Sequence, residues 1–175
     1  QRRAPARRFA GRVRVPFGLG IRGCPTGSGK TTTLDASMSE INGVERNITT
    51  IEDPVEYVFP SINQIQINEQ AGVTFAAGLR SILRQDPDVI LVGEMRDLET
   101  ISAALTIAET GHLALATLHT NSAPEAINRI IDVFPSNQPS QVRAQRAFVL
   151  DSVITNPLPP RLPAPGARRV AEALV

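Results

Sequence analysis

The chain has 175 residues, of which 42% are hydrophobic and 20% charged, so it can bury one core and is expected to form a single domain. Its one cysteine excludes an internal disulfide and favours a reducing compartment, no Cys/His set has zinc spacing, and no apolar run approaches the roughly 20 residues that span a membrane. The net charge of +1 combines a basic head, residues 1–22, with an acidic middle, residues 23–160, which argues against a nucleic-acid-binding core.

The first seventeen residues are rich in Arg, Ala and Pro and have no periodic apolar pattern. We expect residues 1–17 to be a solvated basic segment without regular structure, although such a segment could also contact anionic lipid or nucleic acid, or act as a transit peptide. Because the chain begins with Gln1, we expect a fragment or a processed chain. Residues 18–23 stand where a strand should precede the next motif, but two internal glycines and Arg22 are poorly suited to a buried strand.

Residues 23–33 read Gly-Cys-Pro-Thr-Gly-Ser-Gly-Lys-Thr-Thr-Thr, which is typical of a loop that binds phosphate at the start of a helix. Lys30, the only lysine of the chain, would contact the β/γ-phosphates, and the Thr31 hydroxyl could coordinate Mg²⁺. The strict motif has glycine at position 24, where this chain has Cys24, whose Cβ could crowd the turn. The alternative is a Gly/Ser turn before an ordinary helix. The expected phosphate-binding residues are Pro25, Thr26, Gly27, Ser28, Gly29, Lys30, Thr31 and Thr32.

A helix is predicted from about Gly29 to Glu40, with its end near Asn42-Gly43, and a β-branched strand over Asn47–Ile51. An acidic stretch follows, and Pro54 keeps it from continuing as a helix. We interpret its carboxylates as facing a metal–nucleotide site; the alternative is a polar loop. The three carboxylates are Glu52, Asp53 and Glu56.

The next segment predicts a strand over Ile62–Asn68 with one solvated face, and then a helix capped by Thr74. The apolar face of this helix carries Phe75, Leu79, Ile82 and Leu83. Residues 86–88, Asp-Pro-Asp, break the helix, and the apolar run Val89–Val92 is typical of a central parallel strand. This strand ends in residues 93–97, Gly-Glu-Met-Arg-Asp.

A further helix over Leu98–Glu109, stopped by Gly111, and a second central strand over Leu113–Leu118 are predicted. His112 and His119 flank this strand, and their odd spacing directs them to opposite faces, which argues against a shared metal ion. His119 could contact the γ-phosphate and His112 a neighbouring subunit, or either could be merely structural.

The last part of the chain predicts a helix that begins at Ser122-Ala123-Pro124-Glu125 and runs to about Asp132. Residues 140–154 are also expected to be helical, the proline-rich residues 156–165 to be coil, and residues 170–175 to form a short strand. The alternation of strands and helices predicts an α/β fold, a mostly parallel central sheet flanked by helices. Such sheets bind ligands beyond the carboxyl ends of their strands. The glycine loop and three other polar groups fall at these ends: Glu52/Asp53/Glu56, Glu94/Arg96, and His119.

Together these segments resemble the traffic ATPases of type II secretion and type IV pili, in their carboxy-terminal RecA-like domain, over roughly residues 24–155. Residues 128–135 look most like the pilus-retraction branch, whereas residues 62–68 look more like the secretion and pilus-extension branch, so the branch stays open. The matching segments are the phosphate loop, the acidic box 50–57, residues 79–88, the Walker B segment 89–97 and the histidine box 110–121.

The resemblance implies a RecA-like P-loop NTPase core over residues 18–155, with coil and a possible terminal strand over 156–175. It implies a Mg²⁺-dependent ATPase that works as a homo-hexamer with ATP between subunits, in the cytoplasm, peripheral to the inner membrane and its platform protein. Glu94 would be the catalytic carboxylate, since Gly93 stands where Walker B usually has aspartate. Glu56 would assist at the metal ion or the attacking water, and His119 would couple nucleotide state to movement. The expected metal ligands are Thr31, Glu56 and Glu94.

The chain also departs from this family at both ends, which suggests a fragment or a disturbed reading frame. The family's amino-terminal domain is absent, Cys24 replaces a glycine, and the chain becomes proline-rich after Ile154. A second hypothesis is therefore an inactive nucleotide-binding remnant or scaffold. A third is another P-loop enzyme; GTPases are disfavoured because the guanine-reading Asn-Lys-x-Asp needs a second lysine, and nucleic-acid translocases because the middle of the chain is acidic.

Overall fold

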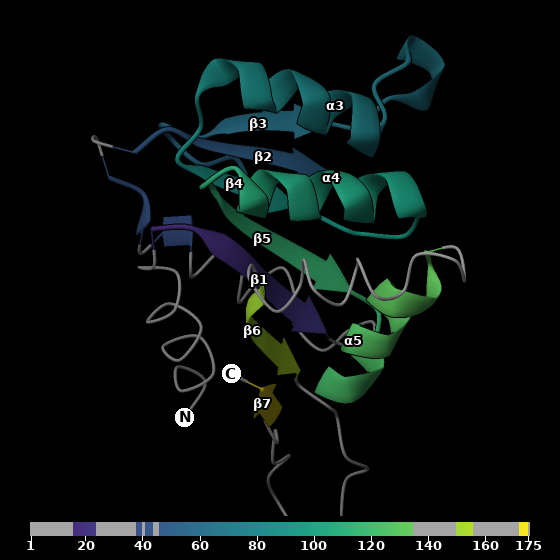
Figure 1. Ribbon diagram of the computed structural model, residues 1–175. Helices are drawn as coiled ribbons and strands as arrows, with labels where there is room; N and C mark the ends of the chain where they lie inside the picture. Colours follow the sequence, from purple (N-terminus) through teal and green to yellow (C-terminus); the bar gives the residue numbers. More distant parts are fainter. Residues whose placement is uncertain are drawn as a thin grey trace, which may run out of the picture.

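The described part of the chain forms one sheet with helices packed on it (Figure 1). The computed structural model describes residues 16–23, 38–39, 41–43, 46–134, 150–155 and 172–174, the last of these by backbone alone. Within these residues the sheet has seven strands in the order β3-β2-β4-β5-β1-β6-β7. The first six are parallel, and β7 is antiparallel to β6. The prediction of a mostly parallel α/β sheet is confirmed.

The strands are short and mostly apolar, as expected for a sheet that is covered on both faces. Central strands β4, β5 and β1 are buried at every position. Their bounds are β1 Gly18–Gly23, β2 Ile48–Glu52, β3 Asn63–Gln66, β4 Val89–Val92, β5 Leu113–Leu118, β6 Leu150–Thr155 and β7 Glu172–Leu174.

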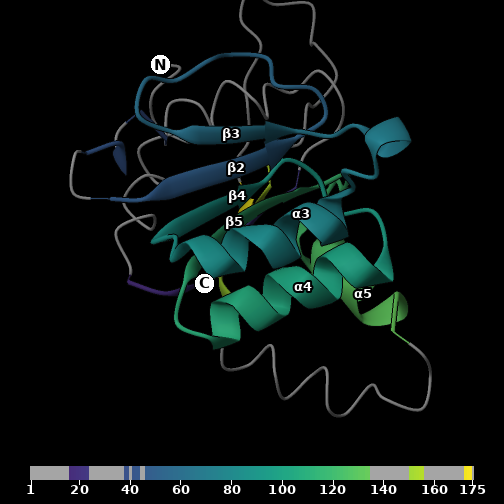
Figure 2. The same cartoon turned by 90° about the horizontal axis from the view of Figure 1, so that it is seen from above.

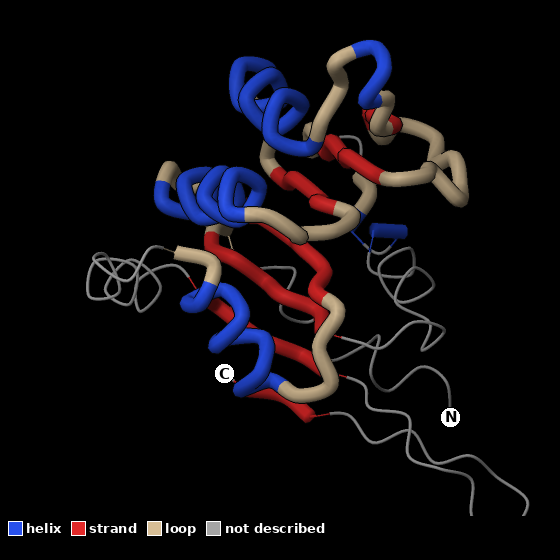
Figure 3. The backbone as a smooth tube through the Cα atoms, turned by 90° about the vertical axis from the view of Figure 1, so that its right-hand side faces the viewer, coloured by secondary structure: helices blue, strands red, loops and turns tan. Residues whose placement is uncertain are grey.

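Three described α-helices lie on the same face of the sheet (Figures 2 and 3). They are α3 Phe75–Ile82, α4 Leu98–Glu109 and α5 Ala123–Asp132, and two single 3₁₀ turns, η1 Glu69–Ala71 and η2 Leu83–Gln85, flank α3. Each α-helix begins with a side-chain cap, because its first N–H groups have no partner within the helix. The capping residues are Thr74, Asp97 and Ser122, whose oxygens accept from Ala77 N, Thr100 N and Glu125 N.

Successive side chains of each strand point to opposite faces of the sheet, and the apolar ones form one cluster on each face. The larger cluster joins the helices to the sheet and includes Ile51, Leu79 and Ile101, each at most 1% exposed. The smaller cluster lies on the opposite face and includes Leu115 with Met38 and Ile41. Met38, Ser39 and Ile41 are helical, and Asn42 N donates to Met38 O, which agrees with a helix end predicted near Asn42. The rest of that predicted helix lies outside the described residues.

The strand expected at residues 18–23 is present although its composition is poorly suited to burial, and the helix expected over residues 140–154 is wrong at its end. Residues 18–23 form a fully buried strand between β5 and β6, because the small Gly20 leaves room for Leu115, whose Cδ2 would lie 3.0 Å from a Cβ there. Arg22 is 0% exposed in the same strand. Residues 150–154 are strand rather than helix, since Val153 and Ile154 pair with β1 and complete its second side. Residues 140–149 lie outside the described part, as do 1–15 and 156–171.

The remaining predicted elements are confirmed within one or two residues. These are the strands at 47–51, 62–68, 89–92, 113–118 and 170–175 and the helices that begin after Thr74, Asp97 and Ser122. Within the described residues no helix is both long and apolar enough to cross a bilayer.

Candidate functional site

The register of the parallel strands aligns several strand ends at one edge of the sheet. Ile51 of β2 pairs with Val92 of β4, and Val92 pairs with Ala116 of β5. The segments after these strands therefore leave the sheet side by side, and the arrowheads in Figure 1 point to this shared edge. Ligands of parallel α/β sheets bind at such an edge.

Glu94 is the centre of the polar cluster at this edge. Its Oε1 accepts a hydrogen bond from His119 Nε2 at 2.8 Å, and its Oε2 lies 2.6 Å from a guanidinium nitrogen of Arg96. The Glu94 side chain is 15% exposed, whereas those of His119 and Arg96 are 38% and 67% exposed. A partly buried polar group is costly without partners, and the Glu94 carboxylate has one on each oxygen.

Arg96 remains a cation in this setting. The hydrogen bond that Arg96 donates to Glu94 and the charge of the same carboxylate raise the pKa of Arg96 above its ordinary value. Asp53 and Glu69 add smaller attractions in the same direction. Arg96 and Asp53 both line a small hollow of about 290 Å³ at this edge.

The backbone around Gly93 fixes where Glu94 can lie. Gly93 N donates to Ile51 O at 2.8 Å, Met95 N donates to Thr117 O at 3.0 Å, and the Thr117 hydroxyl donates to Gly93 O. A Cβ at position 93 would lie 3.0 Å from Ile51 O and 3.1 Å from Glu52 Cα. Because both neighbours are backbone atoms, a side chain at position 93 would be crowded, and these backbone hydrogen bonds hold the segment that carries Glu94.

The carboxylates of the acidic segment have different surroundings. Glu52 Oε1 accepts from the Thr50 hydroxyl and, at 3.1 Å, from Gln64 Nε2, so Glu52 is held by its neighbours in the sheet. Asp53 and Glu56 are exposed, and among the described residues Glu56 makes no hydrogen bond or ion pair. The cluster around Glu94 thus contains His119 but does not contain Glu56.

The expected phosphate-binding residues, Pro25–Thr32, lie outside the described residues. Strand β1, which precedes them, ends at Gly23 on the same edge, opposite Leu118 of β5. A Cβ at Gly23 would collide with the Thr120 hydroxyl and with Cγ2 of Thr155. The end of β1 is therefore packed directly against the segment that carries His119.

The two histidines lie at opposite ends of β5, as the strand predicted over residues 113–118 implies. His112 precedes the strand and its Nδ1 lies 3.0 Å from the Thr110 hydroxyl, whereas His119 follows the strand and contacts Glu94. Within the described part of the chain no three His, Cys, Asp or Glu side chains are grouped to hold a metal ion. Mg²⁺ usually binds one or two carboxylates together with substrate phosphates and water, so the edge suits Mg²⁺ held jointly with a nucleotide.

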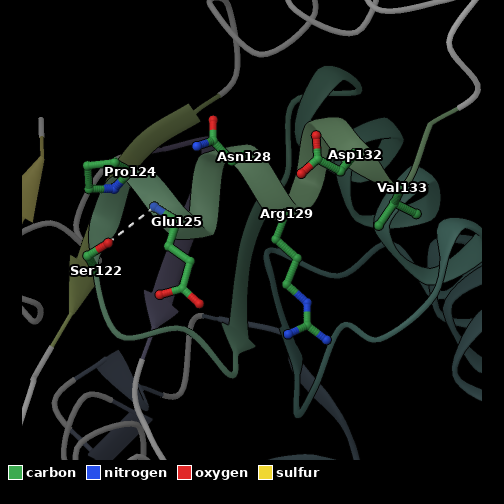
Figure 4. A pocket seen from close by; sticks show the side chains of 7 residues that line it. All are labelled: Ser122, Pro124, Glu125, Asn128, Arg129, Asp132 and Val133. Atoms are coloured by element: carbon green, nitrogen blue, oxygen red, sulfur yellow. Dashed lines mark hydrogen bonds between the residues drawn. The ribbon is translucent and has the colours of Figure 1, made fainter.

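Helix α5 holds the segment that carries His119. Arg129 Nη1 donates to His119 O at 3.2 Å, and Glu125 Oε2 accepts from Asn121 N at 2.8 Å. Figure 4 shows both side chains on the same side of α5, and Asn128 and Asp132 on the other. A shallow groove of about 640 Å³ runs along α5 (Figure 4). Its lining residues are Ser122, Pro124, Glu125, Asn128, Arg129, Asp132 and Val133.

Sequence reasoning did not assign roles to Thr117, Gln64, Glu125 or Arg129. Thr117 reads as an ordinary strand residue, and the hydrogen-bond partners of the other three are backbone groups or side chains up to 12 residues away. The one signal present was the capped start at Ser122, which places residues 125 and 129 on one face of the helix.

Comparison with known proteins assigns the chain to a family. Residues 4–155 match the type II/IV secretion system protein family. The chain belongs to this family. It is 44% identical over 160 residues to the type IV pilus assembly ATPase PilB of Myxococcus xanthus (strain DK1622), a match that covers 91% of the chain and 28% of PilB. It is 54% identical over 121 residues to type II secretion system protein E of Aeromonas hydrophila, which covers 69% of the chain and 24% of that protein.

The fold of this type II/IV secretion system protein matches a solved structure of the same group. The crystal structure of the pilus retraction motor PilT with bound ADP superimposes with a TM-score of 0.87 at 45% identity, covering 96% of the chain and 50% of PilT. The expectation of a traffic-ATPase family and a RecA-like core is confirmed. The chain spans only about a quarter to a half of the length of these three relatives.

Proposed function

We propose that this chain is the catalytic core of an ATP-hydrolysing motor subunit that serves a type IV pilus or a type II secretion machine. The observation that carries the proposal is the Glu94 cluster, a largely buried carboxylate held by His119 and Arg96 at the ligand-binding edge of a parallel sheet. Family membership supports the same conclusion, because its relatives include pilus and secretion ATPases. The branch that the chain serves stays open.

In this proposal ATP binds at the carboxyl edge, with Pro25–Thr32 around its phosphates and Lys30 and Thr31 in their expected roles. When bound, ATP supplies a γ-phosphoryl group for transfer to water, and Mg²⁺ would be held between its phosphates, Thr31 and the carboxylates of Glu94 and Glu56. Phosphoryl transfer depends mainly on positioning and charge neutralisation. A lysine, a threonine hydroxyl and carboxylates suit both positioning and charge neutralisation.

Glu94 orients the attacking water and accepts its proton. Each carboxylate oxygen has two lone pairs, so Oε1 and Oε2 can accept from water while they keep His119 and Arg96. His119 is the residue that reports nucleotide state, because its side chain touches Glu94 and its carbonyl is held by Arg129 of α5. A change at the nucleotide would thereby reach helix α5.

We further propose that the full-length protein acts as a homo-hexamer with ATP between subunits. It would work in the cytoplasm, against an inner-membrane platform protein of the machine and without nucleic acid.

The decisive test is Glu94→Gln, which keeps the shape of the side chain and removes its basicity. We expect ATP hydrolysis under single-turnover conditions to fall by at least about a hundred-fold, because a positioned general base contributes about 10²–10⁴-fold. Fluorescent ATP should still bind, because the phosphate loop is intact, so the loss falls mainly on the hydrolysis step. Glu99→Gln is the matched control, since Glu99 is an exposed carboxylate paired with Arg80.

Two results would contradict the proposal. Hydrolysis that persists in Glu94→Gln would remove Glu94 from the mechanism. A chain that binds no nucleotide, or that gains hydrolysis only with Cys24→Gly, would favour the inactive remnant instead.

A further inference from the structure

The connection between β2 and β3 is unusual for two parallel strands. Parallel neighbours need a crossover that is usually a helix of a dozen or more residues. Here residues 53–62 make the crossover in ten residues without a helix. This segment, which we call the acidic loop, carries Asp53 and Glu56.

The first part of the acidic loop gains little from burial, whereas its end packs on the smaller apolar cluster through Phe59 and Ile62. Its Tyr57 and Val58 are 61% and 86% exposed, and Ile62, at its end, is buried with 9% exposed. Glu56 is exposed and has no hydrogen bond among the described residues. Apolar packing therefore does not determine where Glu56 lies, and other contacts must hold this part of the loop.

Two glutamines of β3 supply those contacts. Gln64 Oε1 accepts from Phe59 N at 2.8 Å, and Gln64 Nε2 donates to Tyr57 O at 2.9 Å. The same Nε2 lies 3.1 Å from Glu52 Oε1, which ties the loop to the end of β2. Gln66 Oε1 accepts from Val55 N at 3.3 Å.

These hydrogen bonds enclose Glu56 on both sides. Val55 precedes it and Tyr57 follows it, and each has a backbone group bound to a glutamine of β3. Gln64 makes the shorter contacts and reaches three groups, so it contributes more than Gln66. Because β3 is part of the rigid sheet, the two glutamines fix the exposed loop to that sheet.

We propose that Gln64, assisted by Gln66, is a positioning residue for the reaction, which sets the place of Glu56 relative to the nucleotide edge. The inference rests on the proposed function in one respect, that Glu56 takes part in hydrolysis. Gln64 touches no substrate and acts through the loop.

The first experiment compares ATP hydrolysis of the chain with its Gln64→Leu, Glu56→Gln and doubly substituted variants. We expect Gln64→Leu to lower kcat by at least about ten-fold with KM unchanged, because misplacement by an ångström costs rate rather than phosphate binding. In the Glu56→Gln background the same substitution should cause no further loss, since Gln64 acts only through Glu56. Gln70→Leu, the same change at an exposed residue of η1, is the control.

The inference is overturned if Gln64→Leu behaves like Gln70→Leu, if the two losses multiply in the double variant, or if Glu56→Gln leaves hydrolysis unchanged. None of these results would affect the role of Glu94, which Glu94→Gln tests separately.

The second experiment does not depend on activity. Amide hydrogen exchange at Phe59 should be slow in the parent chain and in Gln70→Leu, and faster by about ten-fold or more in Gln64→Leu, because the Phe59 N–H loses its acceptor. Equal exchange in all three would overturn the inference even if the chain hydrolyses ATP too slowly to measure. Faster exchange in Gln64→Leu would show that Gln64 holds the loop around Glu56, and loss of rate in the first experiment would show that this position matters for hydrolysis.

Discussion

Glu94 is the residue that the polar side chains surround at the carboxyl edge of the sheet. Its carboxylate is 15% exposed and has a cationic partner on one oxygen and an imidazole on the other. An exposed ion pair contributes little, because water screens it and both side chains lose freedom. The pair of Arg96 with Glu94 therefore serves mainly to orient a partly buried carboxylate, rather than to stabilise the fold.

Gly93 is the residue on which this orientation depends. We predict that Gly93→Ala destabilises the chain by about 1–3 kcal/mol, because the new Cβ would be forced against the backbone of Ile51 and Glu52. Urea unfolding followed by circular dichroism would measure the change. Gly43→Ala is the control, since a Cβ there meets no atom within 4 Å. Equal stability of the Gly93→Ala chain and the parent would contradict this account of the turn.

At the scale of elements, strand β1 shows how neighbours override local composition. Its glycines and Arg22 argue against a buried strand, yet every residue of β1 is buried between β5 and β6. Strand propensity is largely a measure of how a side chain packs on its neighbours. The large Leu115 beside Gly20 fills space that a side chain in β1 would otherwise occupy.

The packing of α3 on β2 offers a second test at this scale. Gly78 of α3 faces Ile51, and a Cβ at position 78 would collide with Ile51 Cδ1. We predict that Gly78→Ala destabilises the chain by about 1–2 kcal/mol, because overpacking outweighs the gain of up to about 1 kcal/mol in helix propensity.

Ile51→Val removes the colliding methyl group, so in that background Gly78→Ala should be neutral or stabilising. Urea unfolding of the four chains in a double-mutant cycle would measure the coupling. Strict additivity would show that the two residues do not meet.

At the scale of the whole molecule, the strand order brings the proposed site together. β4 and β5 are neighbours, and β1 lies beside β5, so the segments after these three strands share an edge. Glu94, His119 and the end of β1 come from parts of the sequence that are far apart. A ligand at this edge would contact several elements at once, and its binding should stabilise the folded chain as a unit.

We predict that Mg²⁺ with ADP raises the thermal unfolding temperature by about 5–10 °C when ADP is present at about a hundred times its Kd. Such binding adds about 2.7 kcal/mol, and each kcal/mol shifts Tm by about 2–4 °C in a chain of this size. Differential scanning fluorimetry would measure the shift. Lys30→Ala should remove it without changing the Tm of the free chain, and chelation of Mg²⁺ should reduce it. An equal shift in Lys30→Ala would contradict the predicted phosphate loop.

Much of the fold could be read from the sequence because its signals are local. The apolar run 89–92, the capped helix after Thr74 and the Ser-Ala-Pro-Glu start at 122–125 each fix an element through neighbouring residues. Residues 150–154 could not be assigned in this way, because their strand exists only through pairing with β1, more than 120 residues earlier in the chain.

The sequence by itself determined the α/β class and placed Glu94 and His119 after neighbouring strands, at the edge where parallel sheets bind ligands. These follow from periodicity, turn residues and the rule that parallel strands share a direction. Only the tertiary structure decided that Glu94 contacts His119 and Arg96, that Glu52 is tied to Gln64, and that β1 is buried. Each of these depends on strand order and register, which long-range packing selects and no local pattern encodes.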